Sequence, residues 1–207
     1  MKFVLFVEGD TEERVLPAFL KRWLDPRLPK PIGIRTVKFR GSGHYAQEIR
    51  KKVHLSLSGS AGEGVVAAIG ILDLYGPTFY PSDRGSAEAR MEWAKRHFEE
   101  RVGHPRFSQH FAVHELEAWL LADRSILPEK VGKALPGRCS EPERVNFDEP
   151  PATLLDKVYR TQLGKPYKKV VDGANLFKAL RPETAAEKCP RLHGLLQEML
   201  VRATQNP

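Results

Sequence analysis

The segment Phe3-Val-Leu-Phe-Val-Glu-Gly-Asp-Thr-Glu-Glu13, near the start of the chain, decides the fold class. Its first five residues, Phe3–Val7, are all apolar, which is typical of a strand buried on both faces of a parallel sheet. Glu8 and Gly9 follow at once, and apolar residues then recur at helical spacing from Val15 to Trp23. The segment therefore predicts a strand, a tight turn and a helix.

Glu8 and Gly9 stand just outside the carboxyl end of this strand, where parallel α/β sheets bind ligands. The glycine allows a backbone or a metal ion to approach closely. Asp10 and Glu13 have the spacing of a helix N-cap and a carboxylate that reaches back to it, and Pro17 should kink the helix or limit its first segment. At this point Glu8 is either a functional carboxylate or a solvated turn residue.

Composition and periodicity predict an N-terminal sheet region followed by a helical one. Further strands are expected at Ile34–Phe39, Val65–Leu72 and Phe107–Val113, and helices at Tyr45–Leu57, Ala87–Val102, Leu154–Leu163, Gly173–Leu180 and Arg191–Arg202. A long proline-containing connection, Leu135–Pro151, lies between the two regions. We expect an α/β domain over residues 1–127, and a basic, mainly helical region packed on it over residues 128–207.

The bulk composition is that of a soluble globular protein, with 41% apolar and 29% charged residues in 207. The most apolar run, Val65–Leu72, is far shorter than the ~20 residues of a membrane span, and the residues before Glu8 are too few for a secretory signal. We therefore expect a cytoplasmic protein without membrane contact. Cys139 and Cys189 lack zinc-ligand spacing, so reduced structural thiols are expected.

The net charge of +7 permits attraction to nucleic acid. Residues 150–207 contain ten Lys or Arg and five Asp or Glu, so +5 of the +7 lies in this segment. A solvated basic face and a phosphate-binding surface explain this distribution equally well.

Carboxylates follow three of the expected strands. Glu8 follows the first strand, Asp73 ends the run that begins at Val65, and Glu115 and Glu117 follow the strand at residues 107–113. Like charges at one edge of a sheet need a cation or protons to be stable, so the pattern predicts a metal site; the alternative is a set of unrelated surface acids. Oxygen ligands favour Mg²⁺ or Mn²⁺, which would polarise a phosphoryl oxygen and activate water for phosphodiester hydrolysis.

Four motifs, in order along most of the chain, resemble a TOPRIM-like family of unknown function. They are Val7-Glu-Gly-Asp-Thr-Glu12, Leu72-Asp-Leu-Tyr-Gly76, His114-Glu-Leu-Glu-Ala-Trp-Leu-Leu-Ala-Asp123 and Tyr167-Lys-Lys169. The first two also look like the TOPRIM domain of topoisomerases, primases and OLD-family nucleases. Members of the family are often encoded beside AAA ATPases in anti-phage systems, and the TOPRIM effector of PARIS-type systems is similar.

The resemblance implies a TOPRIM-like, mostly parallel four-stranded sheet flanked by helices. It makes Glu8 a general acid/base or metal ligand and Asp73 a metal ligand, with Thr11 and Glu12 completing the first motif. TOPRIM enzymes usually have Asp-x-Asp in the second motif, whereas here Tyr75 takes the third position and removes a ligand. Two acids could replace it as metal ligands, Asp83 and Glu117.

In the third motif, Glu115 and Glu117 would share a face on a strand but lie about 200° apart on a helix, where only one could reach the sheet edge. We favour Glu117 as the catalytic residue, because it stands in the part of the motif that the resemblance matches best, and expect Glu115 to cap the helix. His114 is either a general base or a hydrogen-bonded structural histidine.

The fourth motif and its surroundings supply candidate phosphate contacts. Lys165, Lys168 and Lys169, beside Tyr167, are predicted to bind nucleic acid, with an exposed basic turn as the alternative.

Three functions follow from these features. The first is a metal-dependent nuclease acting on DNA or RNA in phage defence, with an AAA- or ABC-type ATPase partner; homo-oligomer formation is left open. The second is a non-catalytic module that docks on an ATPase and senses nucleic acid or a phage protein, which Tyr75 favours. The third is a phosphotransfer enzyme acting on a small phosphoester, and the basic charge favours the polymer over this small substrate.

Overall fold

The computed structural model describes residues 1–144 and 148–205 and contains one four-stranded sheet in which every pairing is parallel. The strands are β1 (Lys2–Val7), β2 (Gly33–Lys38), β3 (Val65–Asp73) and β4 (Phe107–Ala112), in the spatial order β2-β1-β3-β4. The predicted α/β class is therefore confirmed, and each predicted strand lies within one or two residues of its observed position.

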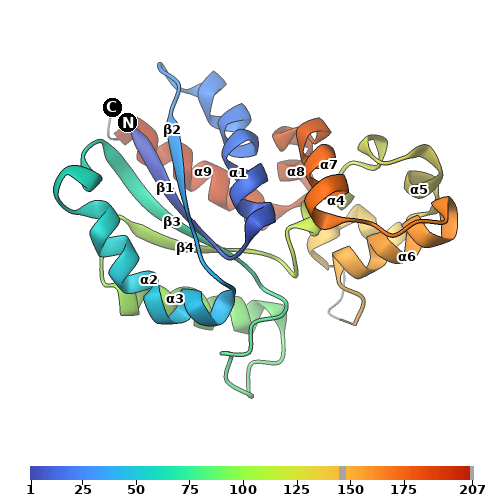
Figure 1. The fold of residues 1–207 in the computed structure, drawn as a ribbon, viewed down its shortest axis with the longest axis horizontal. Coiled ribbons are helices and arrows are strands. Elements are labelled where there is room, and N and C mark those ends of the chain that lie inside the picture. The colour runs from blue at the N-terminus through green and yellow to red at the C-terminus, as the bar shows by residue number, and fades with distance from the viewer. Residues whose placement is uncertain (145–147, 206–207) are drawn as a thin grey trace.

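Helices cover both faces of the sheet (Figure 1). One face carries α2 (Ser42–Leu57) and α3 (Ala87–Val102), and the other carries α1 (Asp10–Leu24) and α9 (Pro190–Gln205). The remaining helices gather beyond the carboxyl ends of the strands: α4 (Glu117–Leu121), α5 (Glu129–Ala134), α6 (Pro151–Leu163), α7 (Ala174–Ala179) and α8 (Pro182–Lys188). The sequence did not predict α5 and α8, which are each only two turns long or less.

The central strand β1 divides the hydrophobic core into two layers. Phe3, Leu5 and Val7 point toward α1 and the C-terminal helices, whereas Val4 and Phe6 point toward α2 and α3. All five are completely buried, which is why this strand is apolar at every position. Because residues of α6, α7 and α9 belong to the same cluster as Phe3, the C-terminal segment packs on the core of the sheet region.

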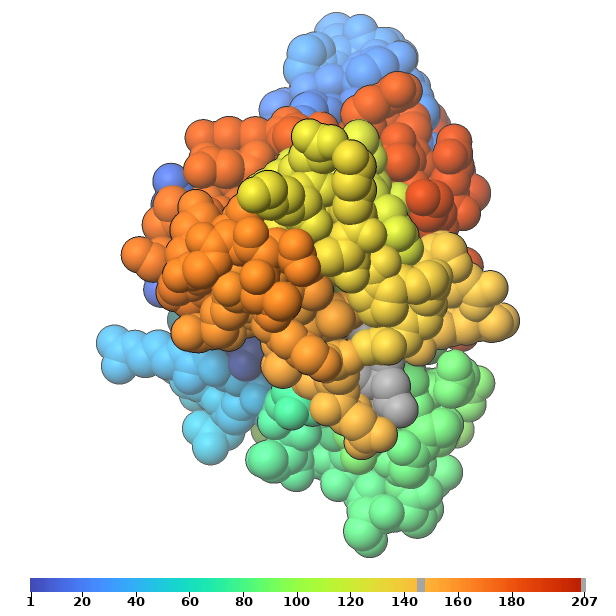
Figure 2. Space-filling model, turned by 90° about the vertical axis from the view of Figure 1, so that its right-hand side faces the viewer, coloured from blue at the N-terminus to red at the C-terminus, as the bar shows by residue number. Residues whose placement is uncertain are grey.

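The C-terminal segment also shapes the surface at the strand ends. In Figure 2 the orange segment, from about residue 150 to 180, lies over the middle of the molecule, with the β3–α3 connection in green below it. The predicted connection Leu135–Pro151 includes residues 145–147, which lie outside the described residues; the described part contains two short 3₁₀ turns.

The predicted N-cap of α1 was wrong, and Pro17 does not end the helix. The N-cap is Gly9, which makes no side-chain hydrogen bond, and both Asp10 and Glu13 instead approach Lys38 at the end of β2, at 2.5 and 3.0 Å. The helix also runs without interruption through Pro17, because its apolar face is held against the sheet on both sides of the proline.

Cys139 and Cys189 are both buried free thiols, as expected. Within the residues that the structure describes, no helix is long and apolar enough to cross a membrane.

Candidate active site

Two carboxylates leave neighbouring strands at the same edge of the sheet. β1 ends directly before Glu8, and β3 ends at Asp73. The two strands pair in parallel with Val7 opposite Ile71, so both side chains emerge at the carboxyl edge. The structure thus brings Glu8 and Asp73 together as the sequence predicts.

Glu8 is held by the start of α2. Its Oε1 accepts a hydrogen bond from the backbone N–H of Ser42 at 3.1 Å, and its carbonyl accepts one from Gly41 at 3.3 Å. Burial raises the pKa of Glu8, and the neighbouring Glu12 raises it further, against the lowering effects of Ser42 and Lys169. Glu8 therefore takes up a proton more readily than a solvated glutamate.

Asp73 is fixed by the third motif. Its Oδ1 accepts a hydrogen bond from the backbone N–H of Leu116 at 2.9 Å. Burial raises the pKa of Asp73 well above its usual range, followed by the negative charges of Glu12 and Glu117, while Lys169 opposes them. Four carboxylates are thus close enough to influence one another through their charges.

Glu12 belongs to this group of carboxylates, although the sequence analysis gave it no role beyond membership of the first motif. It raises the pKa of both Glu8 and Asp73 from its position in the first turn of α1. A Cβ atom on Gly9 would lie only 3.0 Å from Glu12 Oε2, so the glycine leaves room for this carboxylate. The fixed spacing Glu-Gly-x-x-Glu was the signal for it in the sequence.

Lys169 lies among these acids. Its Nζ is 3.1 Å from Glu117 Oε2 and 3.4 Å from Glu115 Oε1. Burial lowers the pKa of Lys169, but Glu117, Asp73 and Glu115 together raise it above its ordinary value, so the side chain is a firmly charged ammonium. We name Glu8, Glu12, Asp73, Glu115, Glu117 and Lys169 the acidic rim.

Both glutamates of the third motif reach Lys169, because they do not share a helix, the case in which only one of them was expected to reach the sheet edge. The chain bends at residues 113–116 and α4 begins only at Glu117, so the two residues do not lie on one helix. Glu115 Oε2 also accepts a hydrogen bond from the backbone N–H of Ala152 at 2.8 Å. Glu115 therefore caps α6, a later helix, rather than its own.

Glu117 is the most buried acid of the rim, with a side chain 2% exposed. Burial raises its pKa, and Lys169 lowers it. The Tyr167 hydroxyl lies 3.5 Å from Glu117 Oε1, and the Tyr167 ring is buried. Tyr167 thus supports the acidic rim from inside and does not form part of an exposed basic turn.

The predicted phosphate contacts divide into two kinds. Lys165 and Lys168 are exposed, so their side chains are accessible to a ligand. Lys169 is engaged with Glu115 and Glu117, which makes it part of the carboxylate group instead of a free surface cation.

His114 and Tyr75 connect the two strand ends. The backbone N–H of Tyr75 donates a hydrogen bond to the His114 carbonyl at 2.7 Å. His114 has φ of 63°, in the left-handed region that non-glycine residues rarely adopt. Its ring is buried, and burial lowers its pKa. These features favour a structural role for His114. The Tyr75 side chain, in contrast, is 41% exposed.

Asp83 is not brought to the acidic rim. It lies on the β3–α3 connection with its side chain 66% exposed and pairs with Arg84 at 3.5 Å. Thr11 is half-buried in the first turn of α1. Across residues 1–144 and 148–205, no three His, Cys, Asp or Glu side chains stand close enough to hold a metal ion as placed.

The donor chemistry of the rim nevertheless fits a hard divalent cation. Every donor is a carboxylate oxygen, which is the ligand type of Mg²⁺ and Mn²⁺. Lys169 forms ion pairs with Glu115 and Glu117, and among the described residues Glu8, Glu12 and Asp73 have no ion pair of their own. These three carboxylates are therefore the rim groups available to a cation.

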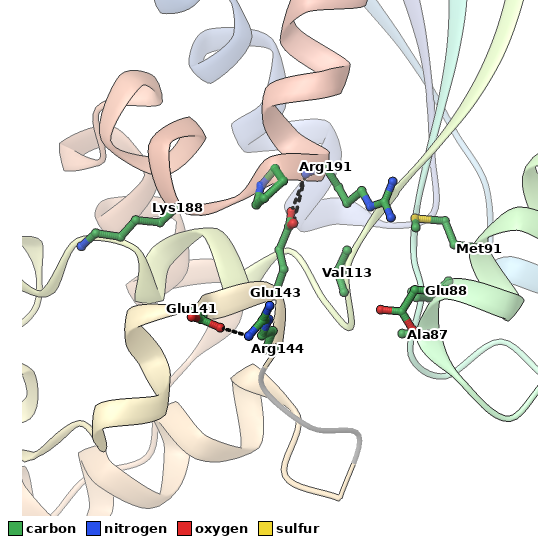
Figure 3. A pocket seen from close by; sticks show the side chains of 11 residues that line it. Ala87, Glu88, Met91, Val113, Glu141, Glu143, Arg144, Lys188 and Arg191 are labelled. Carbon is green, nitrogen blue, oxygen red and sulfur yellow. Dashed lines mark hydrogen bonds and ion pairs between the residues drawn. The ribbon is translucent and has the colours of Figure 1, made fainter.

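A cavity of about 430 Å³ lies beside the rim (Figure 3). Leu74 and Val113, each next to a strand end, form part of its wall, but none of the rim acids lines it. Glu143 in its wall accepts hydrogen bonds from the backbone N–H groups of Arg191 and Leu192, and so caps the start of α9. The cavity is therefore separate from the carboxylates.

Solved structures with a similar arrangement include C-terminal regions of OLD proteins. One, from Burkholderia pseudomallei, shares 17% identity over 97% of this chain and 98% of that chain, with a TM-score of 0.45. Another, from Xanthomonas campestris pv. campestris, shares 16% identity over 98% of this chain and 96% of that chain, also with a TM-score of 0.45. A comparison with curated proteins finds no match. The model of a domain of unknown function, DUF4276, matches residues 7–200, and the chain belongs to that family.

Proposed function

We propose that this protein is a metal-dependent, TOPRIM-type nuclease that hydrolyses phosphodiester bonds in DNA or RNA. The observation that supports this proposal is the acidic rim, in which five carboxylates near the ends of the strands influence one another through their charges, and the Lys169 ammonium contacts two of them, Glu115 and Glu117. Burying so much like charge is costly, and such groups recur where a site binds cations or moves protons. The four sequence motifs lead to the same proposal.

Glu8, Glu12 and Asp73 would hold the metal, because they form no ion pair within the described part of the chain. Mg²⁺ or Mn²⁺ bound there would polarise a phosphoryl oxygen and lower the pKa of an attacking water. The Leu116 N–H orients Asp73, and the Ser42 N–H orients Glu8, so both carboxylates are positioned before any ligand arrives.

The raised pKa of Glu8 suits a second task, proton transfer. A carboxylate that protonates more easily than usual accepts a proton from water and returns it to a leaving oxygen more effectively near neutral pH. Lys169 contacts both Glu115 and Glu117 and lowers the pKa of Glu117 against the effect of burial, and its ammonium would attract the negative charge of a phosphate group.

A role in phage defence and an ATPase partner are further parts of the proposal, and they derive from the four motifs alone. Homo-oligomer formation is left open.

The test is cleavage of plasmid DNA and tRNA by the purified protein with Mg²⁺ or Mn²⁺. We expect Glu8→Gln and Asp73→Asn to lower the rate at least 100-fold, the usual size for loss of an acid/base or metal-binding group. Asp83→Asn is the matched control, since it removes an exposed carboxylate outside the rim, and should leave the rate unchanged. Equal activity in all four proteins would refute the assignment of the site.

The second candidate function is a non-catalytic module that docks on an ATPase and senses nucleic acid or a phage protein. The position of Lys169 favours it specifically, because an internal ammonium already neutralises part of the rim. Titration calorimetry distinguishes the two. A nuclease should bind Mn²⁺ in a manner that Asp73→Asn abolishes, whereas a sensing module should bind nucleic acid with no metal dependence.

A further inference from the structure

A groove on the α2–α3 face of the sheet is lined by basic and polar side chains. It has a volume of about 460 Å³ and is bordered by Gln47, Arg50, Lys51 and His54 of α2 and by Arg101 of α3. Of residues 1–144 and 148–205, no acidic or apolar side chain lines it. This composition differs from that of the cavity in Figure 3, where Glu88, Glu141 and Glu143 stand among the cations.

The cations of this groove are not neutralised. Arg50, Lys51 and Arg101 are exposed, and none of them forms an ion pair or donates a side-chain hydrogen bond to any residue that the structure describes. Glu48 and Glu100 lie on the same two helices but neither borders the groove. Lys38, by contrast, is paired with Asp10 and Glu13.

Two histidines near the groove have lowered pKa values, with burial as the largest cause and nearby cations as a smaller one. Burial lowers the pKa of His97, and Arg101 lowers it further, although Glu100 opposes this. Burial likewise lowers the pKa of His104, assisted by Arg106 and His54. The His54 Nε2 lies 2.8 Å from the Val102 carbonyl, which fixes its ring at the end of the groove.

We propose that this groove binds the phosphate backbone of a polynucleotide, as a contact surface separate from the acidic rim. Three unpaired cations in one open groove match a polyanion, and the absence of apolar lining residues disfavours a membrane surface. Binding in the groove does not depend on the proposed nuclease function. Only the idea that the bound polynucleotide is also the substrate rests on it.

The position of the groove relative to the rim supports this. α2 begins at Ser42, whose N–H holds Glu8, and Gln47 and Arg50 follow on the same helix. At 1.5 Å per residue, Arg50 is about 12 Å and His54 about 18 Å along the helix axis from Ser42. A strand bound in the groove would therefore lie a few nucleotides away from the carboxylates, given about 3.4 Å per nucleotide along one strand.

The experiment measures binding of fluorescent DNA and RNA oligonucleotides in EDTA, so that cleavage plays no part. The variant combines Arg50→Gln, Lys51→Gln and Arg101→Gln. The matched control combines Lys30→Gln, Arg35→Gln and Arg181→Gln, which removes the same charge from exposed cations outside the groove. We expect the groove variant to bind on the order of tenfold more weakly, and its slope of log affinity against log salt to flatten by up to about 2.7 units.

A second measurement uses the wild-type chain alone. Bound oligonucleotide should slow acetylation of Lys51, followed by mass spectrometry, and leave exposed Lys130 unchanged as an internal reference. Cleavage of a small diester, bis(p-nitrophenyl) phosphate, with Mn²⁺ should be the same in wild type and groove variant. That assay tests the acidic rim independently, so failure of the nuclease proposal is distinguishable from failure of the groove proposal.

Several results would overturn the groove proposal. They are equal loss of affinity and slope in the groove and control variants, no binding of any oligonucleotide by wild type, or no protection of Lys51. Binding of phosphatidylserine vesicles that the groove variant loses, with oligonucleotide binding unchanged, would also overturn it and assign the groove to a lipid surface.

Discussion

Carboxylates have shifted pKa values in two groups of charged side chains, one between α9 and β4 and one at the strand ends, and the shifts have opposite directions. Under α9, Glu198 accepts hydrogen bonds from Ser108 and from Arg202 Nε, the latter at 2.9 Å, and lies 3.1 Å from His110 Nε2. Burial raises the pKa of Glu198, but His110, Ser108 and Arg202 outweigh burial, so its pKa lies far below the ordinary value.

At the acidic rim the balance is reversed. The Lys169 ammonium pairs with only two of the five carboxylates, and the pKa values of Glu8, Asp73 and Glu117 are all raised, with burial as the largest cause. Glu198, a single carboxylate with three polar partners, holds α9 against β4. A group of carboxylates with too few partners weakens the fold unless a cation or protons arrive, which is the property of a site that evolved to bind something.

The largest expected effect tests whether Lys169 is the counter-ion of the rim. In Lys169→Met, Glu117 would remain buried without its ammonium, while methionine keeps the unbranched stem. Because Lys169 is 41% exposed, we expect a loss of about 2 kcal/mol in unfolding free energy at pH 8 in EDTA, less than for a fully buried pair. The loss should shrink at pH 5, where Glu117 takes up a proton more easily.

The control is Lys168→Met at the adjacent exposed position, which should leave the unfolding free energy unchanged. Adding Mg²⁺ should stabilise Lys169→Met more than wild type, because the cation enters a more negative site. Urea unfolding that gives the same free energy for Lys169→Met and wild type at both pH values would contradict the counter-ion role.

The second effect tests the opposite group. Glu198→Gln keeps the shape of the side chain but removes the charge that His110, Ser108 and Arg202 bind, so we expect a loss of about 1.5 kcal/mol near pH 7. Since the folded pKa of Glu198 is lowered, its contribution is present above the unfolded value of 4.5 and is lost as the pH falls below it. Wild type and variant should therefore converge on acidification, whereas the exposed control Glu187→Gln should match wild type throughout. A constant difference from pH 7 to pH 3 would exclude the charge as the cause.

Much of the rim followed from the sequence because it depends on local order. An apolar run followed by an acid predicts a buried strand with a carboxylate at its end, and parallel strands bring Glu8 and Asp73 to one edge. The approximate positions of four strands and of the long helices followed from the same periodicities. Catalytic and metal-binding roles of these residues stay predictions.

What the sequence could not give is the pairing of residues distant along the chain. Lys169 reaches Glu115 across 54 residues, so only the packing of the C-terminal segment on the sheet reveals it as the counter-ion. The N-cap of α1 was mispredicted for the same reason, because Lys38 comes from β2. The sequence did not predict the groove, because it does not show that Arg50, Lys51 and Arg101 lie together or whether acids lie near them.

The smallest expected effect is also the one with the most informative sign. Asp73→Asn keeps an oxygen that can accept the Leu116 N–H but removes one negative charge from the rim. Burial and the nearby acids raise the folded pKa of Asp73 above the unfolded value of 3.8, so ionisation of Asp73 destabilises the folded state. This loss of unfolding free energy is absent below pH 3.8 and grows as the pH rises toward the folded pKa. Asp73→Asn should thus be more stable than wild type by about 0.5 kcal/mol at pH 7 in EDTA and equal to it at pH 3.5.

With Mg²⁺ the order of stability should reverse, because wild type gains binding free energy that the variant cannot. Urea unfolding at both pH values, with Asp83→Asn as the unchanged control, measures this. A variant less stable than wild type in EDTA at pH 7 would mean that the rim is balanced as it stands, like the Glu198 group, and needs no metal.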